Sequence, residues 1–242
     1  MEVSRGEVFC ILGANGCGKT TLLRCLSGSL YLHRGFVRLG KSDLRSMKPD
    51  AIVKKIGFIF QEHEIPFPYS VMEIVCMGRA PHLSLFGSPS NGDKEIAEEA
   101  LSSIGMLHLK DKPYTQVSGG ERQLILIART LAQQPDIIMM DEPTSHLDFK
   151  NQIIILQIVN QLAQQGIDVL MTSHFPDHAL LFSSRVALMK EGNFLNVGKP
   201  ENVITNRTLE EIYGIGVNVI SVNDPSTGKE LKLCVPKTSS GK

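Results

Sequence analysis

The chain has 242 residues, and 42% of them are hydrophobic, which is enough to bury a core without disulfides or a structural metal. Its 25 Lys and Arg residues balance its 25 Asp and Glu residues, so no global field attracts nucleic acid or an anionic membrane. The five cysteines show no CxxC pair and no zinc spacing, and the longest apolar runs fall far short of the ~20 residues of a spanning helix. We therefore expect a soluble protein of a reducing cytosol that binds no nucleic acid.

Short apolar runs of strand length alternate with segments of helical periodicity along most of the chain. This alternation is typical of an α/β fold in which a mostly parallel sheet is covered by helices. The predicted strands lie at residues 7–12, 56–60, 136–141, 167–172 and 185–189.

Two segments depart from this rhythm. Residues 66–117 contain Pro- and Gly-rich stretches and the amphipathic segment "DKEIAEEALSSIG", so we expect an inserted helical lobe there. Residues 201–242 carry a helix near "TLEEIYG" and two alternating strands around "NDPSTG", which predict an accessory C-terminal segment. A single domain would then have its core in residues 5–65 and 118–200.

Residues 13–21, "GANGCGKTT", lie between the first predicted strand and a helical stretch and satisfy the motif G-x-x-x-x-G-K-[ST]. Glycines let backbone N–H groups turn inward around phosphate oxygens, and the positive end of the following helix points at the same anion. Lys19 would place a charge on the β and γ phosphates, and Thr20 would offer a hydroxyl ligand to Mg²⁺. The other interpretation is a glycine-rich turn that only begins a helix. The predicted nucleotide-binding residues of this loop are Gly13, Ala14, Asn15, Gly16, Cys17, Gly18, Lys19, Thr20 and Thr21.

A pair of carboxylates ends the predicted strand in "DIIMMDEP", residues 136–143. Because side chains alternate along a strand, we expect Asp141 and Glu142 to face different ways. One carboxylate would hold Mg²⁺ through water, and the other would face an attacking water. A strand that ends in Asp-Glu also serves as an ordinary cap for the next helix, and it is the phosphate loop that favours the functional interpretation.

The segment "VSGGERQ", residues 117–123, precedes the helical run "LILIARTLAQQ" and then the acidic strand. This order resembles the ABC-type ATPase family, and the resemblance extends over residues 5–200. Further matches are Gln61 in "FIFQE", "SHLD" at 145–148, and His174 in "LMTSH", which in that family are the Q-loop, the D-loop and the switch histidine. Without the resemblance, "SGGE" is merely a serine cap before a helix.

The resemblance implies a P-loop fold of ABC type that works as a pair of copies. Two copies would bind two ATP molecules head to tail, each site combining the phosphate loop of one copy with the signature segment of the other. The segment lies at a helix N-terminus and can present N–H donors to an anion. The signature residues that would close over the γ-phosphate are Ser118, Gly119, Gly120 and Glu121.

The resemblance also assigns chemical roles. Glu142 would orient or polarise the attacking water, and His174 would contact the γ-phosphate. Thr20, Gln61 and Asp141 would be the residues at the Mg²⁺ ion, and Gln61 would link that ion to the helical lobe.

The chain departs from the family pattern at several positions. Val117 stands where Leu is common, Glu121 where Gln is common, and Cys17 where Ala or Ser is usual. Only twelve residues precede Gly13, whereas relatives have two further strands and an aromatic residue that stacks on adenine. We expect that the sequence begins at an internal Met of a longer protein, that the N-terminal antiparallel strands are truncated, and that ATP affinity is reduced.

The segment "VMEIVCMGRAPHLSLFG", residues 71–87, resembles the helical lobe of ATPases that serve import of iron-siderophores, haem, cobalamin or related metal chelates, and in some relatives of molybdate or tungstate. By this resemblance the lobe docks on integral-membrane permease subunits, with a substrate-binding protein beyond them. Arg79 and His82 are expected at the rim of that docking surface. The protein would be peripheral at the cytoplasmic face of the cell membrane, held there by the permease.

Two other classes of protein share these motifs. A soluble ABC-type machine of chromosome maintenance or DNA repair would need a long coiled-coil insertion before the signature, and no sustained heptads are present. A non-catalytic scaffold would use the motifs only for nucleotide-dependent docking, and the intact Glu142 and His174 argue against it.

Overall fold

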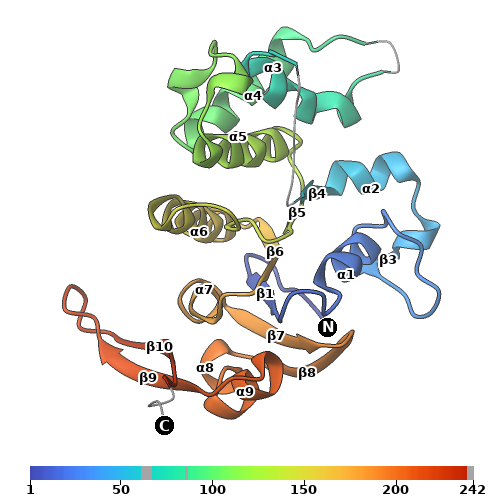
Figure 1. Cartoon of the computed structure of the whole chain (residues 1–242). Helices are drawn as coiled ribbons and strands as arrows, with labels where there is room; N and C mark the ends of the chain where they lie inside the picture. The colour runs from blue at the N-terminus through green and yellow to red at the C-terminus, as the bar shows by residue number, and fades with distance from the viewer. Residues whose placement is uncertain (61–66, 85–86, 239–242) are drawn as a thin grey trace. The chain divides into compact units, whose positions relative to one another are not determined.

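The structure is a computed structural model that describes residues 1–60, 67–84 and 87–238 (Figure 1). The chain divides into two compact units, one of Met1–Leu22 with Val159–Lys242 and the other of Leu23–Ile158. Two helices, α1 (Lys19–Leu26) and α6 (Phe149–Gln164), contribute residues to both units. In the described part of the chain, no helix combines the length and the apolar character that crossing a membrane requires.

The first unit is built on a mostly parallel group of strands. β1 (Val8–Leu12) lies between β6 (Asp168–Ser173) and β7 (Arg185–Lys190) and is parallel to both, while β8 (Asn193–Gly198) is antiparallel to β7. Every residue of β1 is buried, as its continuous apolar sequence "VFCIL" requires. The carboxyl ends of β1 and β6 lie together, because Leu12 pairs with Ser173.

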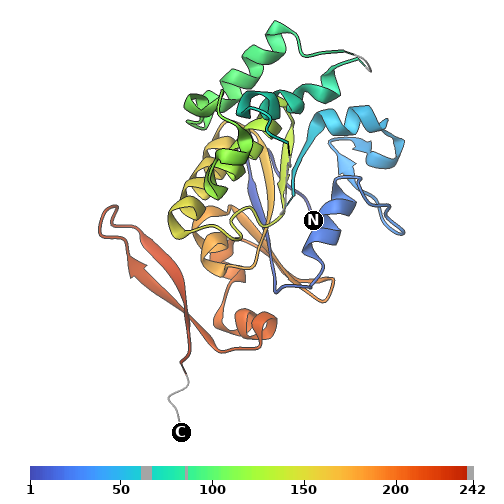
Figure 2. The same cartoon turned by 45° about the horizontal axis from the view of Figure 1, so that its top comes forward.

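Short helices and a β-ribbon complete this unit. The helices are α7 (Pro176–Phe182), α8 (Pro200–Val203) and α9 (Asn206–Tyr213). A Thr205 side chain caps the start of α9, and Gly214 ends it in the left-handed conformation, at φ 69°. β9 (Val217–Asn223) and β10 (Glu230–Pro236) form an antiparallel ribbon whose far turn extends away from α8 and α9 (Figure 2).

The second unit contains a parallel strand pair, β4 (Ile56–Ile59) and β5 (Ile137–Met140), and a small antiparallel pair, β2 (Arg38–Leu39) and β3 (Ser42–Asp43). Helix α2 (Pro49–Lys55) precedes β4 and begins with a proline, which suits the first turn of a helix because its missing N–H would have no helical partner there.

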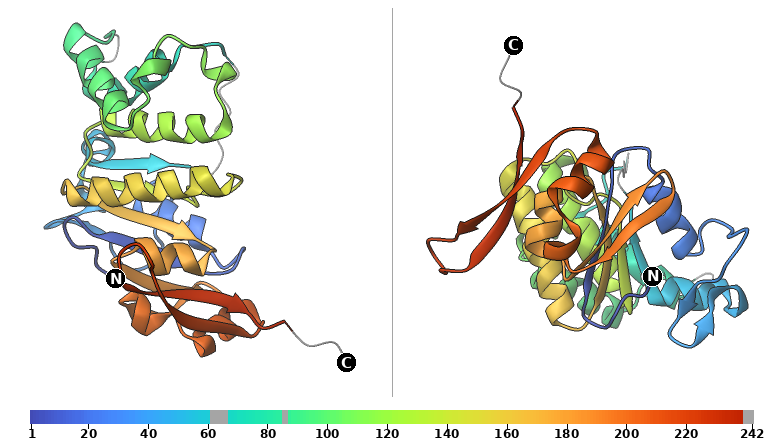
Figure 3. Two further views of the ribbon diagram at one scale, coloured as in Figure 1. Left: turned by 90° about the vertical axis from the view of Figure 1, so that its left-hand side faces the viewer. Right: turned by 90° about the horizontal axis from the view of Figure 1, so that it is seen from below.

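The helices α3 (Val71–Cys76), α4 (Asn91–Ser103) and α5 (Gly119–Ala132) of this unit pack against one another (Figure 3). Each of the three begins at a serine that forms a capping box with an acidic residue three positions later, so two backbone donors are satisfied at every start. Segments of 3₁₀ helix connect them at Met77–His82, Leu107–Leu109 and Tyr114–Gln116.

The α/β class and the helical insertion are confirmed, and each predicted core strand is present with its ends within one residue of the prediction. The ribbon and helix of the C-terminal segment are also where the sequence placed them. The proposed boundaries between core, lobe and accessory segment remain predictions.

Candidate functional site

The phosphate-loop motif has the local structure that it requires, since β1 ends at Leu12 and α1 begins at Lys19. Gly16 and Gly18 have φ values of 79° and 103°, and residues that carry a side chain rarely adopt such values. A Cβ on Gly13 would lie 2.5 Å from the carbonyl oxygen of Met189, so this position has no room for a side chain. The backbone from 13 to 18 therefore follows a path that depends on glycine at three of its six positions.

Lys19 is 5% exposed and its ammonium group lies over the loop that precedes it. Nζ donates to the carbonyl oxygens of Gly13 and Ala14, at 2.8 and 3.1 Å. The positive charge is thus held at the mouth of the loop, beside the N-terminus of α1, where both the charge and the helix dipole favour an anion. Thr20, in the first turn, is partly exposed.

His174 lies in the same unit as the phosphate loop, immediately after β6. The Gly13 N–H donates to the Ser173 carbonyl oxygen at 3.3 Å, so the start of the loop is directly beside the residue before His174. The His174 ring packs on Phe175, with ring centroids 4.0 Å apart. Its carbonyl oxygen accepts a hydrogen bond of 2.9 Å from the Tyr213 hydroxyl. Tyr213 was not among the predicted site residues, because it lies 39 positions after His174 and no local pattern relates the two.

The acidic pair lies in the second unit, and the expected strand geometry is wrong. β5 ends at Met140, and Asp141 and Glu142 occupy the turn that follows, with Glu142 in the left-handed region at φ 47°. Asp141 is 2% exposed, whereas Glu142 is partly exposed. This difference in exposure comes from the turn and not from alternation along a strand. The Ser145 hydroxyl donates to Glu142 Oε2 at 2.9 Å and orients that carboxylate. Non-glycine residues at positive φ are uncommon, and they gather at functional sites as well as in tight turns.

The signature residues form the start of α5. The Ser118 N–H donates to Glu121 Oε2 at 2.7 Å, and the Glu121 N–H donates to Ser118 Oγ at 3.3 Å. These bonds to Ser118 hold the pKa of the Glu121 carboxyl below its usual value. Ser118 and Gly119 are exposed, while Gly120 is buried and a Cβ on it would lie 2.4 Å from the Asn151 side chain. The first-turn N–H groups that the capping box does not use are those of Gly119 and Gly120, and Gly119 is exposed.

The D-loop residues connect this start to α6. The Asn151 N–H and its side-chain amide donate to the Asp148 carboxylate at 2.8 and 3.1 Å, and His146 has a positive φ of 62°. Because Asn151 of α6 also lies against Gly120, this one residue links Asp148 of the D-loop to the signature segment within the unit. The predicted Gln61 lies outside the described residues.

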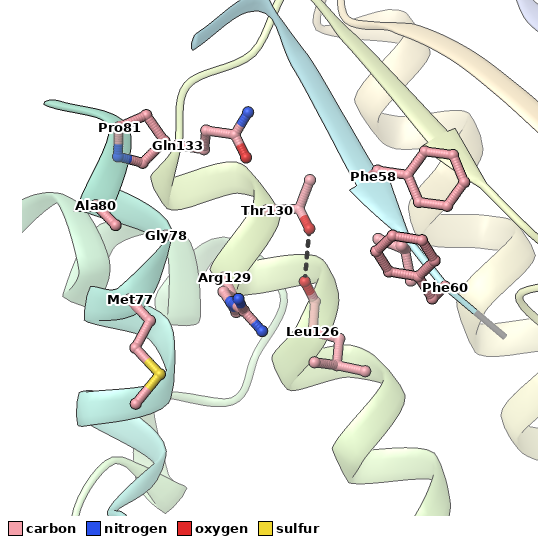
Figure 4. Close-up of a pocket in the computed structure, with 11 residues that line it drawn as sticks. Phe58, Phe60, Met77, Gly78, Ala80, Pro81, Leu126, Arg129, Thr130 and Gln133 are labelled. Atoms are coloured by element: carbon pink, nitrogen blue, oxygen red, sulfur yellow. Dashed lines mark hydrogen bonds between the residues drawn. The ribbon is translucent and has the colours of Figure 1, made fainter. Parts of the chain in front are cut away.

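A cavity of about 260 Å³ lies in the second unit, beside β4, the 3₁₀ turn Met77–His82 and α5 (Figure 4). The Phe58 and Phe60 rings on one side are 4.4 Å apart between centroids. Burial lowers the pKa of the Arg129 guanidinium on the other side. The residues that line the cavity are Phe58, Ile59, Phe60, Met77, Gly78, Ala80, Pro81, Leu126, Arg129, Thr130 and Gln133.

The expectation that Arg79 lies at an exposed rim is wrong. Its side chain is 8% exposed and forms an ion pair with Asp93 at 2.9 Å, and it also donates to the Ala132 carbonyl oxygen at 2.8 Å. Arg79 therefore joins the turn after α3 to the start of α4 and the end of α5. His82 is exposed and contacts the Gln133 carbonyl oxygen at 2.9 Å.

Comparison with known proteins finds relatives along most of the chain. The family model described as "ABC transporter" matches residues 1–145. The molybdate import ATP-binding protein MolC of Haemophilus influenzae is 38% identical over 88% of this chain and 79% of its own length. The iron(3+)-hydroxamate import ATP-binding protein FhuC of Bacillus subtilis is 34% identical over 96% of this chain and 86% of its own length.

Solved structures of ABC transporters are also similar to this chain. A transporter assigned to the metal-chelate type, in an inward-facing conformation, has a TM-score of 0.89 and 33% identity, covering 99% of this chain and 89% of its own. A dimeric bacterial ABC transporter cassette has a TM-score of 0.71 and 28% identity, covering 83% of this chain and 88% of its own.

Proposed function

Because the chain belongs to the ABC transporter family, we propose that it is the ATP-binding and hydrolysing subunit of a membrane importer. The proposed cargo is an iron-siderophore, haem, cobalamin or a related metal complex or oxyanion. Relatives that import molybdate and iron(3+)-hydroxamate, and a solved transporter of metal-chelate type, support this class. The observation that carries the proposal is the strand, loop and helix at 8–26 with the buried ammonium of Lys19 held over the loop.

ATP would bind with its phosphates in the loop of residues 13–21. Lys19 would then exchange its contacts with two backbone carbonyl groups for contacts with phosphate oxygens, and the N-terminus of α1 would add its dipole. The oxygen donors of Thr20 and Asp141, with Gln61, suit Mg²⁺, which prefers oxygen ligands and commonly takes one or two protein groups plus phosphates and water. Mg²⁺ bound there would neutralise charge on the phosphates.

Glu142 would accept a proton from the attacking water while the water oxygen bonds to the γ-phosphorus and the bond to the β-phosphate oxygen breaks, giving ADP and phosphate. Ser145 holds one oxygen of the Glu142 carboxylate, which limits the directions in which the other can point. His174 would contact the γ-phosphate from the end of β6, beside the phosphate loop.

Two copies would form the working unit, because the signature segment of one copy would complete the site of the other. The exposed Ser118 and Gly119 at the start of α5 suit this arrangement, since first-turn N–H groups on an open surface can reach an anion held by another molecule. The likeness to a dimeric ABC cassette supports the pairing.

The permease subunits would dock on the helical lobe, and the protein would thereby be held at the cytoplasmic face of the membrane. The cavity beside Met77 and Arg129 has a mixed lining, with apolar side chains on one part and a guanidinium on another, which suits an apolar side chain next to a carbonyl or carboxylate of the partner. A substrate-binding protein would deliver cargo to the permease from the other side.

Uptake by cells tests the importer function. Cells that lack the gene would be complemented with the parental chain or with Glu142→Gln, and uptake of labelled ferric hydroxamate, haem, cobalamin and molybdate measured. We expect uptake of one of the four to need the gene and to be restored by the parental chain alone. Normal uptake of all four without the gene would contradict the proposal, and so would restoration by Glu142→Gln.

A further inference from the structure

The turn between β7 and β8 consists of two residues, Glu191 and Gly192, and both have positive φ, at 48° and 79°. Two-residue hairpin turns with this conformation favour Asn-Gly or Asp-Gly, since most side chains disfavour a positive φ. Glu191 therefore adopts an unfavourable conformation here, and the Asn193 side-chain amide donates to its carbonyl oxygen at 3.1 Å. The backbone conformation of this turn is therefore not the one that Glu191 itself favours.

The turn contacts the phosphate loop directly. The Gly192 N–H donates to the Cys17 carbonyl oxygen at 2.9 Å. Met189, at the end of β7, lies against the same loop: its carbonyl oxygen is next to Gly13, and its Cε would be 3.3 Å from a Cβ on Gly18. All of these residues belong to the first unit, so the loop and the hairpin form one local assembly.

The hydrogen bond from Gly192 fixes the orientation of one peptide group in the loop. A trans peptide is planar, so the C=O of Cys17 and the N–H of Gly18 point in opposite directions. With the Cys17 oxygen directed outward to Gly192, the Gly18 N–H is directed away from the hairpin. In a phosphate loop that N–H belongs to the set of amides that turn inward around the anion.

We propose that Gly192 is a positioning residue for phosphate binding, because its N–H holds the Cys17–Gly18 peptide with the Gly18 N–H directed at the phosphates. The inference rests on the proposed function of residues 13–21 as the ATP phosphate site. Gly192 does not contact the nucleotide in this scheme. It acts through Cys17, and any change that alters the turn releases the peptide to rotate.

Substitution at Gly192 tests the turn without steric conflict, since no atom lies within 4 Å of a Cβ built there. Gly192→Val forces a β-branched residue out of positive φ, whereas Gly192→Asn keeps a residue that tolerates it. The matched control is Gly228→Val, at φ 67° in the β9–β10 turn of the same unit, also with nothing within 4 Å. Gly192→Ala is a milder form of the first change.

The Kd of a fluorescent ATP analogue and the thermal midpoint are measured for every variant. We expect Gly192→Val to weaken binding roughly ten- to hundredfold, as loss of one hydrogen bond to a charged group does. Gly192→Ala should show a smaller loss, and Gly192→Asn and Gly228→Val should stay within about threefold of the parental Kd. Both valine variants should lower the thermal midpoint, so stability alone does not separate them.

Parental affinity in folded Gly192→Val and Gly192→Ala would overturn the inference. A loss of affinity in Gly228→Val as large as in Gly192→Val would overturn it as well, because the effect would then be general destabilisation. The affinity of Lys19→Ala for the same analogue tests whether residues 13–21 are the phosphate site at all. If Lys19→Ala binds the analogue at parental affinity, residues 13–21 are not the phosphate site, and that result refutes the proposed function of the loop separately.

Discussion

The hydroxyl of Tyr213 donates a hydrogen bond of 2.9 Å to the carbonyl oxygen of His174. Tyr213 is the last residue of α9, and Gly214 ends that helix in the left-handed conformation. The C-terminal segment therefore has a defined contact with the residue proposed to meet the γ-phosphate.

Tyr213→Phe removes this hydroxyl and keeps the ring. We expect kcat for ATP hydrolysis to fall roughly two- to tenfold, in line with one hydrogen bond, while the Kd for ATP stays unchanged because the phosphate loop is intact. Steady-state hydrolysis and nucleotide titration measure the two quantities. Tyr31→Phe, at an aromatic residue that is 74% exposed, is the matched control and should change neither. A parental kcat in Tyr213→Phe would show that this contact has no part in turnover.

Glu142→Gln replaces the proposed base with an isosteric amide that accepts protons poorly. Hydrolysis should fall at least ~100-fold while ATP still binds, since general base catalysis contributes at about this level. Because ATP would then persist, light scattering should detect a stable pair of copies in ATP and single chains without it. Glu99→Gln, on α4 and outside the site, is the control. Parental turnover in Glu142→Gln would mean that another group activates the water.

Arg79→Met leaves the nearly buried Asp93 carboxylate without its cation. Loss of this cation should lower the free energy of unfolding, which urea unfolding would detect. His82→Met, at an exposed position, should cost less than about 0.5 kcal/mol. The double variant Arg79→Met with Asp93→Asn should recover part of the loss, because no uncompensated charge remains. Equal stability of Arg79→Met and the parental chain would contradict the role of this ion pair.

The same carboxylate predicts a pH dependence. Hydrogen bonds from Ser90 and then Arg79 lower the pKa of Asp93 from 3.8 to about 2. Because the folded chain favours the ionised form, the stabilisation is complete above the unfolded pKa and is lost as the pH falls through about 2. The free energy of unfolding, measured from pH 5 downward, should therefore fall less steeply in Asp93→Asn than in the parental chain. Parallel curves would exclude Asp93 as a source of this dependence.

Much of the fold and of the phosphate loop could be predicted because the signals are local. The run "VFCIL" is apolar throughout and forms a buried strand, and the loop glycines follow it within a few residues. The capping pair Ser118 and Glu121 likewise lies three positions apart, so the start of α5 was expected from spacing alone.

The features that were missed depend on contacts between distant parts of the chain. Gly192 meets Cys17, and Tyr213 meets His174, and no local pattern in the sequence relates the members of either pair. Arg79 was expected at a rim because nothing local in the sequence shows that its partner, Asp93, belongs to another helix. Asp141 and Glu142 were expected to alternate as strand residues do, because the apolar run before them gives no sign that the strand ends at Met140.

The central claim is that one active site needs two copies of this chain, and mixing two inactive variants tests it most directly. Lys19→Ala removes the phosphate-binding charge, and Ser118→Arg blocks the exposed signature segment, so each variant alone should lack ATPase activity. In a mixed pair, the intact loop of one copy meets the intact signature of the other. The account predicts that hydrolysis reappears on mixing, whereas full activity of Ser118→Arg alone, or a mixture as inactive as its components, would contradict it.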